Sequence, residues 1–277
     1  MDLRGNMQKK TLLAACLAAT SLYSLEETPW LNTLYQFNLL ADATYSKYRY
    51  VDEALVQPTH TYNNYLTSLG FGFTPSPSFG MELEVELART PYQNYGFRSA
   101  AVGARYLVLD GIAGDPFSLV VGGNLRPVRS RSVRDISSPY GSYMNYEAMI
   151  SIGKELLAKE QWLLRGYLVG TVGIANRGSF WDRFSAVLEG RFLPSQVLKL
   201  FAHGYFGYGS NKIVDIENFR GWGEMNHSSI DIGMEYRYST PLWGELGLSY
   251  AHRVLAKSYP ENEQTFTLSY KLPFSLF

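Results

Sequence analysis

The sequence predicts an all-β fold, a transmembrane antiparallel up-and-down β-barrel of about twelve strands. Three observations predict it: apolar side chains at every second position of repeated segments, an alternation of short and long connections, and abundant tyrosine and glycine. Side chains alternate across a strand, so a two-residue rhythm gives one apolar and one polar face. About 9 to 11 tilted residues cross a bilayer as a strand, and only a closed barrel leaves no unpaired backbone in lipid.

Composition supports this fold class. The 277 residues include 21 Tyr, 15 Phe, 5 Trp and 25 Gly, which suits the aromatic girdles and the curvature of such a barrel. Charged residues make up 18%, below the soluble norm of about 25%. No stretch after residue 25 approaches the roughly 20 apolar residues of a spanning helix. A net charge of zero gives no reason to expect nucleic acid as a partner.

The first segment, 1–24, reads as a cleavable signal peptide that is excluded from the fold. Lys9 and Lys10 precede a short apolar core rich in Leu and Ala. Cleavage after Ser21 or after Ser24 satisfies the small-residue rule. The signal predicts secretion through the inner membrane.

Cys16 is the single cysteine, so a mature chain that lacks it has no disulfides and no cysteine metal site. Leu13–Cys16 also resembles a lipoprotein box with a lipidated cysteine, although the apolar run continues past it. An ordinary cleaved signal is the favoured interpretation. Residues 25–277 then form one outer-membrane β-barrel domain, with Leu25–Asn32 as its exposed start.

The segment 79–89 illustrates the strand pattern. Met81, Leu83 and Val85 share one face, while glutamates alternate with them on the other. The same reading along the chain predicts strands at 34–49, 63–74, 79–89, 97–109, 117–127, 143–154, 162–174, 183–193, 197–208, 228–238, 243–254 and 264–276.

Connections between these segments alternate in length. Every second one is short and built from turn residues, at 75–78, 110–116, 156–161, 194–196 and 239–241. The others are mostly longer and richer in polar and aromatic residues, at 50–62, 90–96, 128–142, 175–182, 209–227 and 255–263. Short periplasmic turns and longer external loops are the pattern of an outer-membrane barrel, with the C-terminus on the short-turn side.

The end of the chain carries a resemblance to a known class. Phe266, Leu268, Tyr270, Leu272 and Phe274 alternate, and the chain stops at Phe277. In this, and in its strand and loop pattern, the chain resembles a Gram-negative outer-membrane β-barrel protein of the porin-like kind. The resemblance implies location in the bacterial outer membrane, contact with its lipid, and insertion machinery that reads a final phenylalanine. Phe277 departs from the usual phase, and Pro273 is expected to interrupt the ladder.

If the apolar set faces lipid, the polar set faces the lumen, because a charge on the lipid side costs roughly 2–4 kcal/mol at the midplane. We expect acidic and basic walls to face each other across a constriction that sets selectivity. The competing interpretation is a lumen closed by ion pairs and tyrosines. The candidate pore-lining residues are Glu82, Glu84, Glu86, Arg105, Arg126, Arg183, Arg191 and Arg237.

Two loops carry further alternatives. The stretch 126–134 holds four arginines, which suggests an anion-attracting vestibule, a grip on lipid phosphates, or simply a solvated loop. The loop 209–227 holds Phe219 and Trp222, and is read as an inward constriction, a binding tip or, by preference, an ordinary packed loop.

The favoured function is a passive pore for small hydrophilic solutes or ions. One alternative is a non-conducting surface barrel whose loops bind a partner. A less favoured one is a lipid hydrolase that uses His252, which falls on the apolar phase of its strand, with a neighbouring serine. We expect no enzyme activity: no recognisable catalytic motif, metal pattern or phosphate loop is present in the sequence. No cofactor is expected.

Overall fold

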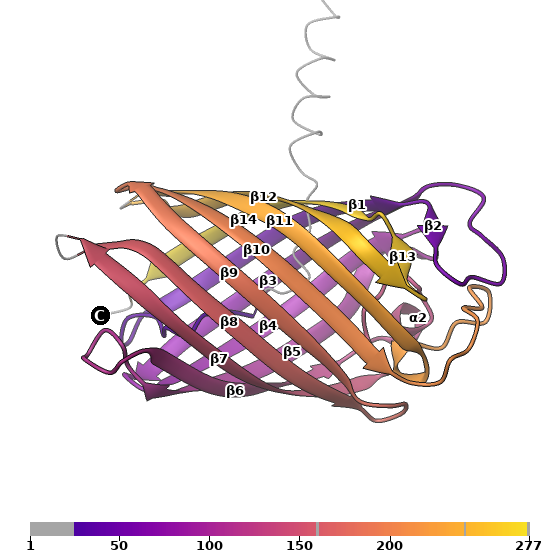
Figure 1. Ribbon diagram of the computed structural model, residues 1–277, viewed down its shortest axis with the longest axis horizontal. Helices are drawn as coiled ribbons and strands as arrows, with labels where there is room; N and C mark the ends of the chain where they lie inside the picture. Colours follow the sequence, from indigo (N-terminus) through magenta and orange to yellow (C-terminus); the bar gives the residue numbers. More distant parts are fainter. Residues whose placement is uncertain (1–24, 159–160, 241, 276–277) are drawn as a thin grey trace, which may run out of the picture.

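The computed structural model describes residues 25–158, 161–240 and 242–275, and twelve of its strands close into a tilted barrel (Figure 1). The predicted signal peptide, Cys16 and Phe277 lie outside the described residues. The barrel strands are β1 (Phe37–Tyr48), β3 (Tyr62–Ser76), β4 (Phe79–Thr90), β5 (Gln93–Leu109), β6 (Ser118–Pro127), β7 (Met144–Ala158), β8 (Gln161–Ala175), β9 (Trp181–Leu193), β10 (Gln196–Tyr208), β11 (Asn226–Thr240), β12 (Gly244–Lys257) and β14 (Gln264–Phe274). Each pairs antiparallel with its neighbours, and β14 returns to pair with β1.

All twelve predicted strands are present, and two details of the prediction were wrong. The connection at 90–96 is not a long loop, because β5 begins at Gln93 and pairs it with Thr90 across a two-residue turn. Pro273 does not interrupt the final ladder, which continues through the pairs Asn38↔Pro273 and Phe37↔Phe274.

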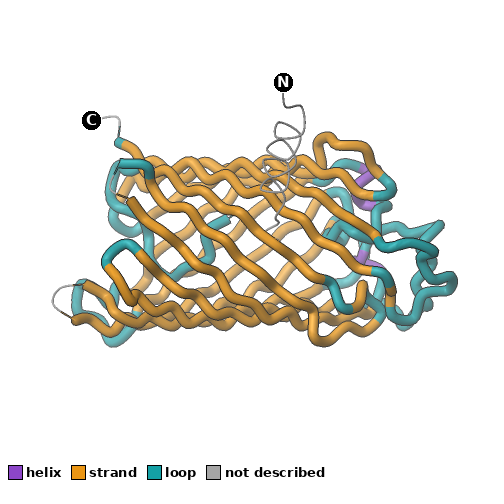
Figure 2. The backbone as a smooth tube through the Cα atoms, turned by 90° about the horizontal axis from the view of Figure 1, so that it is seen from above, coloured by secondary structure: helices purple, strands orange, loops and turns teal. Residues whose placement is uncertain are grey.

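The connections sort to opposite ends of the barrel, called here the turn end and the loop end (Figures 1 and 2). The loop end also carries the small sheet of β2 (Tyr50–Val51) and β13 (Pro260–Glu261), the helical turn α2 (Ser130–Val133) and the 3₁₀ turn η1 (Trp222–Glu224). Among the described residues, no helix is long and apolar enough to cross a bilayer.

The barrel is apolar outside and polar inside. On the outer face, Leu83 is 55% exposed and Leu168 is 58% exposed. Their neighbours along the chain turn inward, and Glu84 is only 2% exposed. This inverted burial matches a barrel that meets hydrocarbon on its outer face and satisfies its charges within.

An aromatic core closes the space beneath the loops at the loop end. Trp222, from the β10–β11 connection, is fully buried and lies beside the buried Phe219. They pack with Ile136 from the β6–β7 connection and with Tyr259 beyond β12. The loop 209–227 is therefore packed inward over the barrel mouth, with Trp222 and Tyr259 ring centroids 4.4 Å apart.

The segment before β1 lies inside the barrel. Trp30 is 9% exposed and meets the Tyr167 ring edge-on at 5.7 Å between centroids. The Glu26 backbone N–H donates to Glu82 at 2.8 Å. The expectation that Leu25–Asn32 forms an exposed start was therefore wrong, because this segment offers an aromatic side chain and a carboxylate that the lumen wall binds.

Candidate functional site

The predicted carboxylate row on β4 faces the lumen, and β5 and β6 supply its partners. Arg105 lies 2.8 Å from Glu82, while Arg126 lies 2.9 Å from Glu84 and 3.3 Å from Glu86. All five side chains are buried, since period-two alternation sends every second residue of these strands inward. These acidic and basic groups are in direct contact, so they do not face each other across open water as the expected constriction requires.

The β6–β7 connection reinforces this wall from above. The Tyr140 hydroxyl donates to Glu86, and the Ser99 hydroxyl donates to the same carboxylate at 2.6 Å. Burial holds the pKa of Tyr140 well above its ordinary value despite the nearby Arg126, so the phenol remains a donor. Asp135, in the same connection, accepts a hydrogen bond from Thr90 at 2.5 Å. This connection therefore folds into the loop end of the lumen.

Glu26 of the N-terminal segment is held by two strands. Its carboxylate lies 3.0 Å from Arg105 and forms an ion pair with Lys271 of β14. Arg105 also donates to the Thr28 carbonyl at 3.0 Å, and Asn32 donates to Glu26 at 2.7 Å. Burial opposes ionisation, but Lys271 and Arg105 outweigh it and bring the pKa of Glu26 down to about 2. The segment is thus fixed by charge-assisted contacts.

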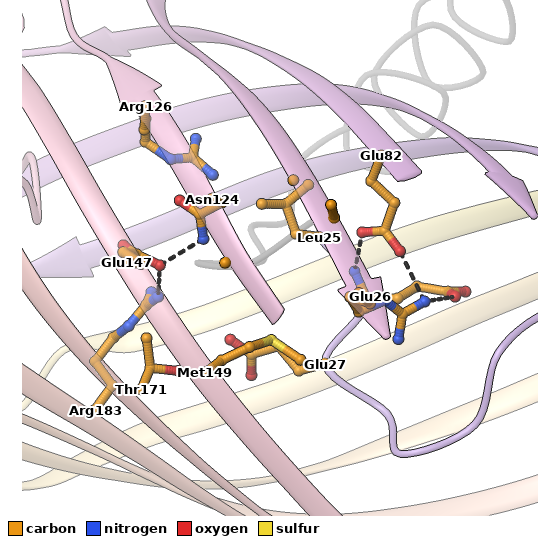
Figure 3. Close-up of a pocket in the computed structure, with 14 residues that line it drawn as sticks. Leu25, Glu26, Glu27, Glu82, Asn124, Arg126, Glu147, Met149, Thr171 and Arg183 are labelled. Atoms are coloured by element: carbon orange, nitrogen blue, oxygen red, sulfur yellow. Dashed lines mark hydrogen bonds and ion pairs between the residues drawn. The ribbon is translucent and has the colours of Figure 1, made fainter. Parts of the chain in front are cut away.

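The neighbouring carboxylate has a different environment. Glu27 lines a small cavity of about 30 Å³ together with Glu147 and Arg183 (Figure 3). Arg183 forms an ion pair with Glu147, which also accepts from Asn124 at 2.7 Å. Burial raises the pKa of Glu27, an effect that the attraction of Arg183 offsets only in part. Adjacent residues of one segment are therefore biased toward opposite protonation states.

A second charge network lies near the turn end. Glu189 pairs with Arg165 and, at 2.7 Å, with Arg237, which also lies 3.4 Å from Glu245. Arg191 stacks over the Trp162 ring at 4.1 Å from its centroid. The candidates Arg237 and Arg191 thus belong to this network, on the wall remote from the β4 row.

Between the N-terminal segment and β8–β12, β14 and β1 lies a chamber of about 380 Å³. It reaches from Lys271 near the turn end to Thr265 farther up β14, and His203 faces it with Ser185 at 2.8 Å. Its acidic lining residues are Glu26, Glu27, Asp42, Glu189, Asp231, Glu235 and Glu245, and its basic ones are Arg165, Lys199, Arg237 and Lys271. The chamber lining thus combines apolar side chains with charged ones, and carboxylates outnumber basic groups.

Sequence reasoning missed several residues that lie inside the lumen or at its loop end. Glu26, Thr28 and Trp30 precede the first strand and have no strand pattern to reveal them, and Tyr140 lies in a loop. The available signal was Trp30, an isolated aromatic residue in a segment otherwise read as exposed.

The other predicted features have ordinary positions. Arg126 belongs to β6 and points inward, while Arg131 donates to the Tyr92 carbonyl at 3.1 Å at the loop end. His252 lies opposite Ile232 and Gln264, so its direct cross-strand neighbours offer no serine. Over the described ranges, no group of three or more His, Cys, Asp or Glu side chains is placed to hold a metal ion.

No protein-family model matches the chain, and no curated protein matches it by sequence. Solved structures do match its fold. An outer membrane channel from Pseudomonas putida F1 aligns over 92% of this chain and 100% of its own, with 9% identity and a TM-score of 0.66. The NanC porin aligns over 84% of this chain and 100% of its own, with 10% identity and a TM-score of 0.55. The KdgM porin aligns over 83% of this chain and 98% of its own, with 12% identity and a TM-score of 0.50. The chain therefore has the fold of porin-like outer-membrane channels.

Proposed function

We propose that the protein is a passive outer-membrane channel for small hydrophilic solutes or ions, which its own N-terminal segment holds closed. The observation that carries the proposal is the chamber of about 380 Å³, one wall of which is this segment. A segment that is not part of the barrel ladder can leave without breaking a single strand pair. Displacing it enlarges a space that is already lined with charged and hydroxyl groups.

The fold supports this function by likeness. The three solved structures compared above are an outer membrane channel and two porins. One of these porins, KdgM, was also solved in complex with a disordered oligogalacturonate. That ligand is a chain of acidic sugars, whereas the chamber here has more acids than bases. We therefore extend to this chain only the general class, small hydrophilic solutes.

In this proposal the predicted pore-lining residues have two roles. The first role is to stabilise the wall to which the N-terminal segment binds, and it belongs to Glu82, Glu84, Glu86, Arg105, Arg126 and Arg183. Arg237 and Arg191 belong to the turn-end network, where Arg237 lines the chamber and meets a passing solute.

The proposed arrangement is one mature domain from about residue 25, exported by the signal peptide 1–24 and inserted by the barrel-insertion machinery. The turn end then faces the periplasm and the loop end faces outside.

A surface barrel that binds a partner through its loops is the second candidate. The sealed aromatic core around Trp222 favours it, since a fully buried tryptophan stiffens the outer mouth. No observation favours a lipid hydrolase.

Single-channel recording in a planar bilayer under a salt gradient separates the two candidates. For a channel, we expect brief openings from the wild-type protein and long ones from the double variant Glu26→Gln/Trp222→Ala, which loosens both barriers. Silence from both proteins, each retaining β-structure and heat-shifted gel mobility, would support the surface barrel.

A further inference from the structure

The outer wall carries a continuous aromatic row near the loop end. Tyr65, Tyr45, Phe266 and Tyr250 come from four adjacent strands, β3, β1, β14 and β12. Their successive ring centroids are 5.4, 6.5 and 4.9 Å apart, and the pairs Tyr45↔Phe266 and Tyr250↔Phe266 are in direct register. Amphipathic rings in such a row mark the boundary between hydrocarbon and headgroups.

One step toward the loop end, a polar row follows on the same face. Lys47 pairs with Gln264, and Gln264 pairs with His252. Asn63 of β3 extends the row and accepts a hydrogen bond from the Tyr45 hydroxyl at 2.6 Å. The polar row thus lies directly above the rings, at headgroup level.

Two permanent cations flank these rows. Lys47 lies between Ser46 and Tyr48, which are 5% and 3% exposed and face inward, so Lys47 faces outward. By the same alternation Arg89 faces outward beside the buried Thr90, and it pairs in register with Tyr65.

The barrel wall offers these cations no counter-charge. The strands β1, β3, β4, β12 and β14, all of whose residues are described, have no Asp or Glu on their outward phase. In the loop beyond β1, Asp52 and Glu53 instead accept hydrogen bonds from Ser258. The outward wall of these strands therefore leaves Lys47 and Arg89 open to an anion from the surroundings of the barrel.

We propose that this face, with Lys47 above the row from Tyr65 to Tyr250 and Arg89 beside its Tyr65 end, binds the headgroup of a phosphorylated membrane lipid. The apolar wall below takes the acyl chains, the rings lie at the ester level, and the two cations contact phosphate oxygens. Asn63 and Gln264 carry amide donors that can complete the contact. Because two fixed positive charges flank the face, it prefers a headgroup with two or more negative charges. This inference is independent of whether the lumen conducts.

Native mass spectrometry of the detergent-purified full-length mature protein tests the proposal. Three lipids are added separately at equal concentration: bisphosphorylated lipid A, lipid A with its phosphates removed, and zwitterionic phosphatidylethanolamine. We expect one bisphosphorylated molecule to be retained, with at least 10-fold weaker retention of the other two.

The double variant Lys47→Gln/Arg89→Gln is expected to lose at least 10-fold of that retention. Lys154→Gln is the matched control, since Lys154 is an exposed lysine on β7 toward the turn end, opposite Gly166. Its retention should equal that of the wild type, and all proteins should keep heat-shifted gel mobility. Three results would overturn the proposal. They are equal retention of all three lipids, an equal loss of retention in the double variant and in Lys154→Gln, and displacement of the lipid by millimolar inorganic phosphate alone.

Discussion

Arg105 Nη2 lies 3.0 Å from Glu26 Oε2, which joins a strand of the barrel wall to the segment that blocks the lumen. The same guanidinium lies 2.8 Å from Glu82, so one arginine serves both the wall and the segment. Lys271 also forms an ion pair with Glu26, and it lies on β14, the strand that closes the barrel by pairing with β1. In the proposed closed state, the ion pairs that hold the N-terminal segment therefore converge on one carboxylate, which no strand pairing holds in place.

The first prediction concerns that carboxylate. Glu26→Gln leaves Arg105 and Lys271 without a full counter-charge, and breaking a buried pair costs about 3–5 kcal/mol when one partner is lost. We expect the N-terminal segment to leave the lumen at least 10-fold more often. A cysteine placed at Ser249, which lines the chamber, reports this through its rate of modification by a charged maleimide, and it is the single cysteine of the mature chain.

Glu217→Gln is the control for this change, because Glu217 is an exposed carboxylate in the β10–β11 connection. Its labelling rate should match that of the parent protein. An unchanged rate for Glu26→Gln would mean that the segment is held by its apolar contacts instead.

The second prediction tests those apolar contacts through a glycine. A Cβ added at Gly153 would lie 2.6 Å from Pro29 Cγ and 2.7 Å from Tyr167 Cβ, closer than real contacts allow. Gly153→Ala should therefore push the segment from its seat around Trp30, raising the same labelling rate. Gly72→Ala provides the comparison, because its added Cβ would lie 3.7 Å or more from any neighbour. Equal labelling rates for the two alanine variants would show that the close packing at Gly153 does not determine closure.

The sequence predicts the barrel far better than it predicts the closed lumen, and the reason is physical. Each strand can be recognised by its alternation of apolar and polar side chains, so the neighbours Leu83 and Glu84 already indicate which face meets lipid. A carboxylate such as Glu26 shows no periodicity, and its partners Arg105 and Lys271 lie 79 and 245 residues away. Inward phase could be read for Glu82 and Arg105, but their mutual neutralisation depends on register between strands, which alternation alone does not fix.

The third prediction concerns the loop end. Trp222→Ala leaves a large hole in the aromatic core, and such truncations cost about 3–5 kcal/mol. Since the core and the N-terminal segment block the lumen in series, we expect Trp222→Ala alone to change conductance little. Combined with Glu26→Gln, it should raise open probability beyond the sum of the single variants. If the effects of the two single variants on open probability in planar bilayers simply add, the core and the segment would instead block two separate paths in parallel.

The fourth prediction concerns selectivity. In the β4 row, Glu82, Glu84 and Glu86 contact Arg105 and Arg126, so neither sign dominates that wall. The chamber differs: once the N-terminal segment with Glu26 and Glu27 has left, its barrel lining has five acidic and four basic side chains. We expect the open channel to prefer cations, and Asp42→Asn to move the reversal potential toward zero under a potassium chloride gradient. An anion-preferring channel would contradict this assignment of the conducting surface to the chamber.

The fifth prediction follows from the opposite shifts of Glu26 and Glu27. The pKa of Glu26 is about 2, below its ordinary 4.5, so its contribution to closure is complete above pH 4.5 and is lost as pH falls toward 2. The pKa of Glu27 is raised by burial, so its contribution is complete below pH 4.5 and is lost as pH rises through the raised value. In the Trp222→Ala background, where the core no longer blocks the lumen, open probability should therefore pass through a minimum in mild acid and rise on both sides. Glu26→Gln should flatten the limb at lower pH and Glu27→Gln the limb at higher pH, with far-UV circular dichroism confirming an intact barrel throughout. An acidic limb that persists in Glu26→Gln would assign the acid response to another carboxylate and remove Glu26 from the gate.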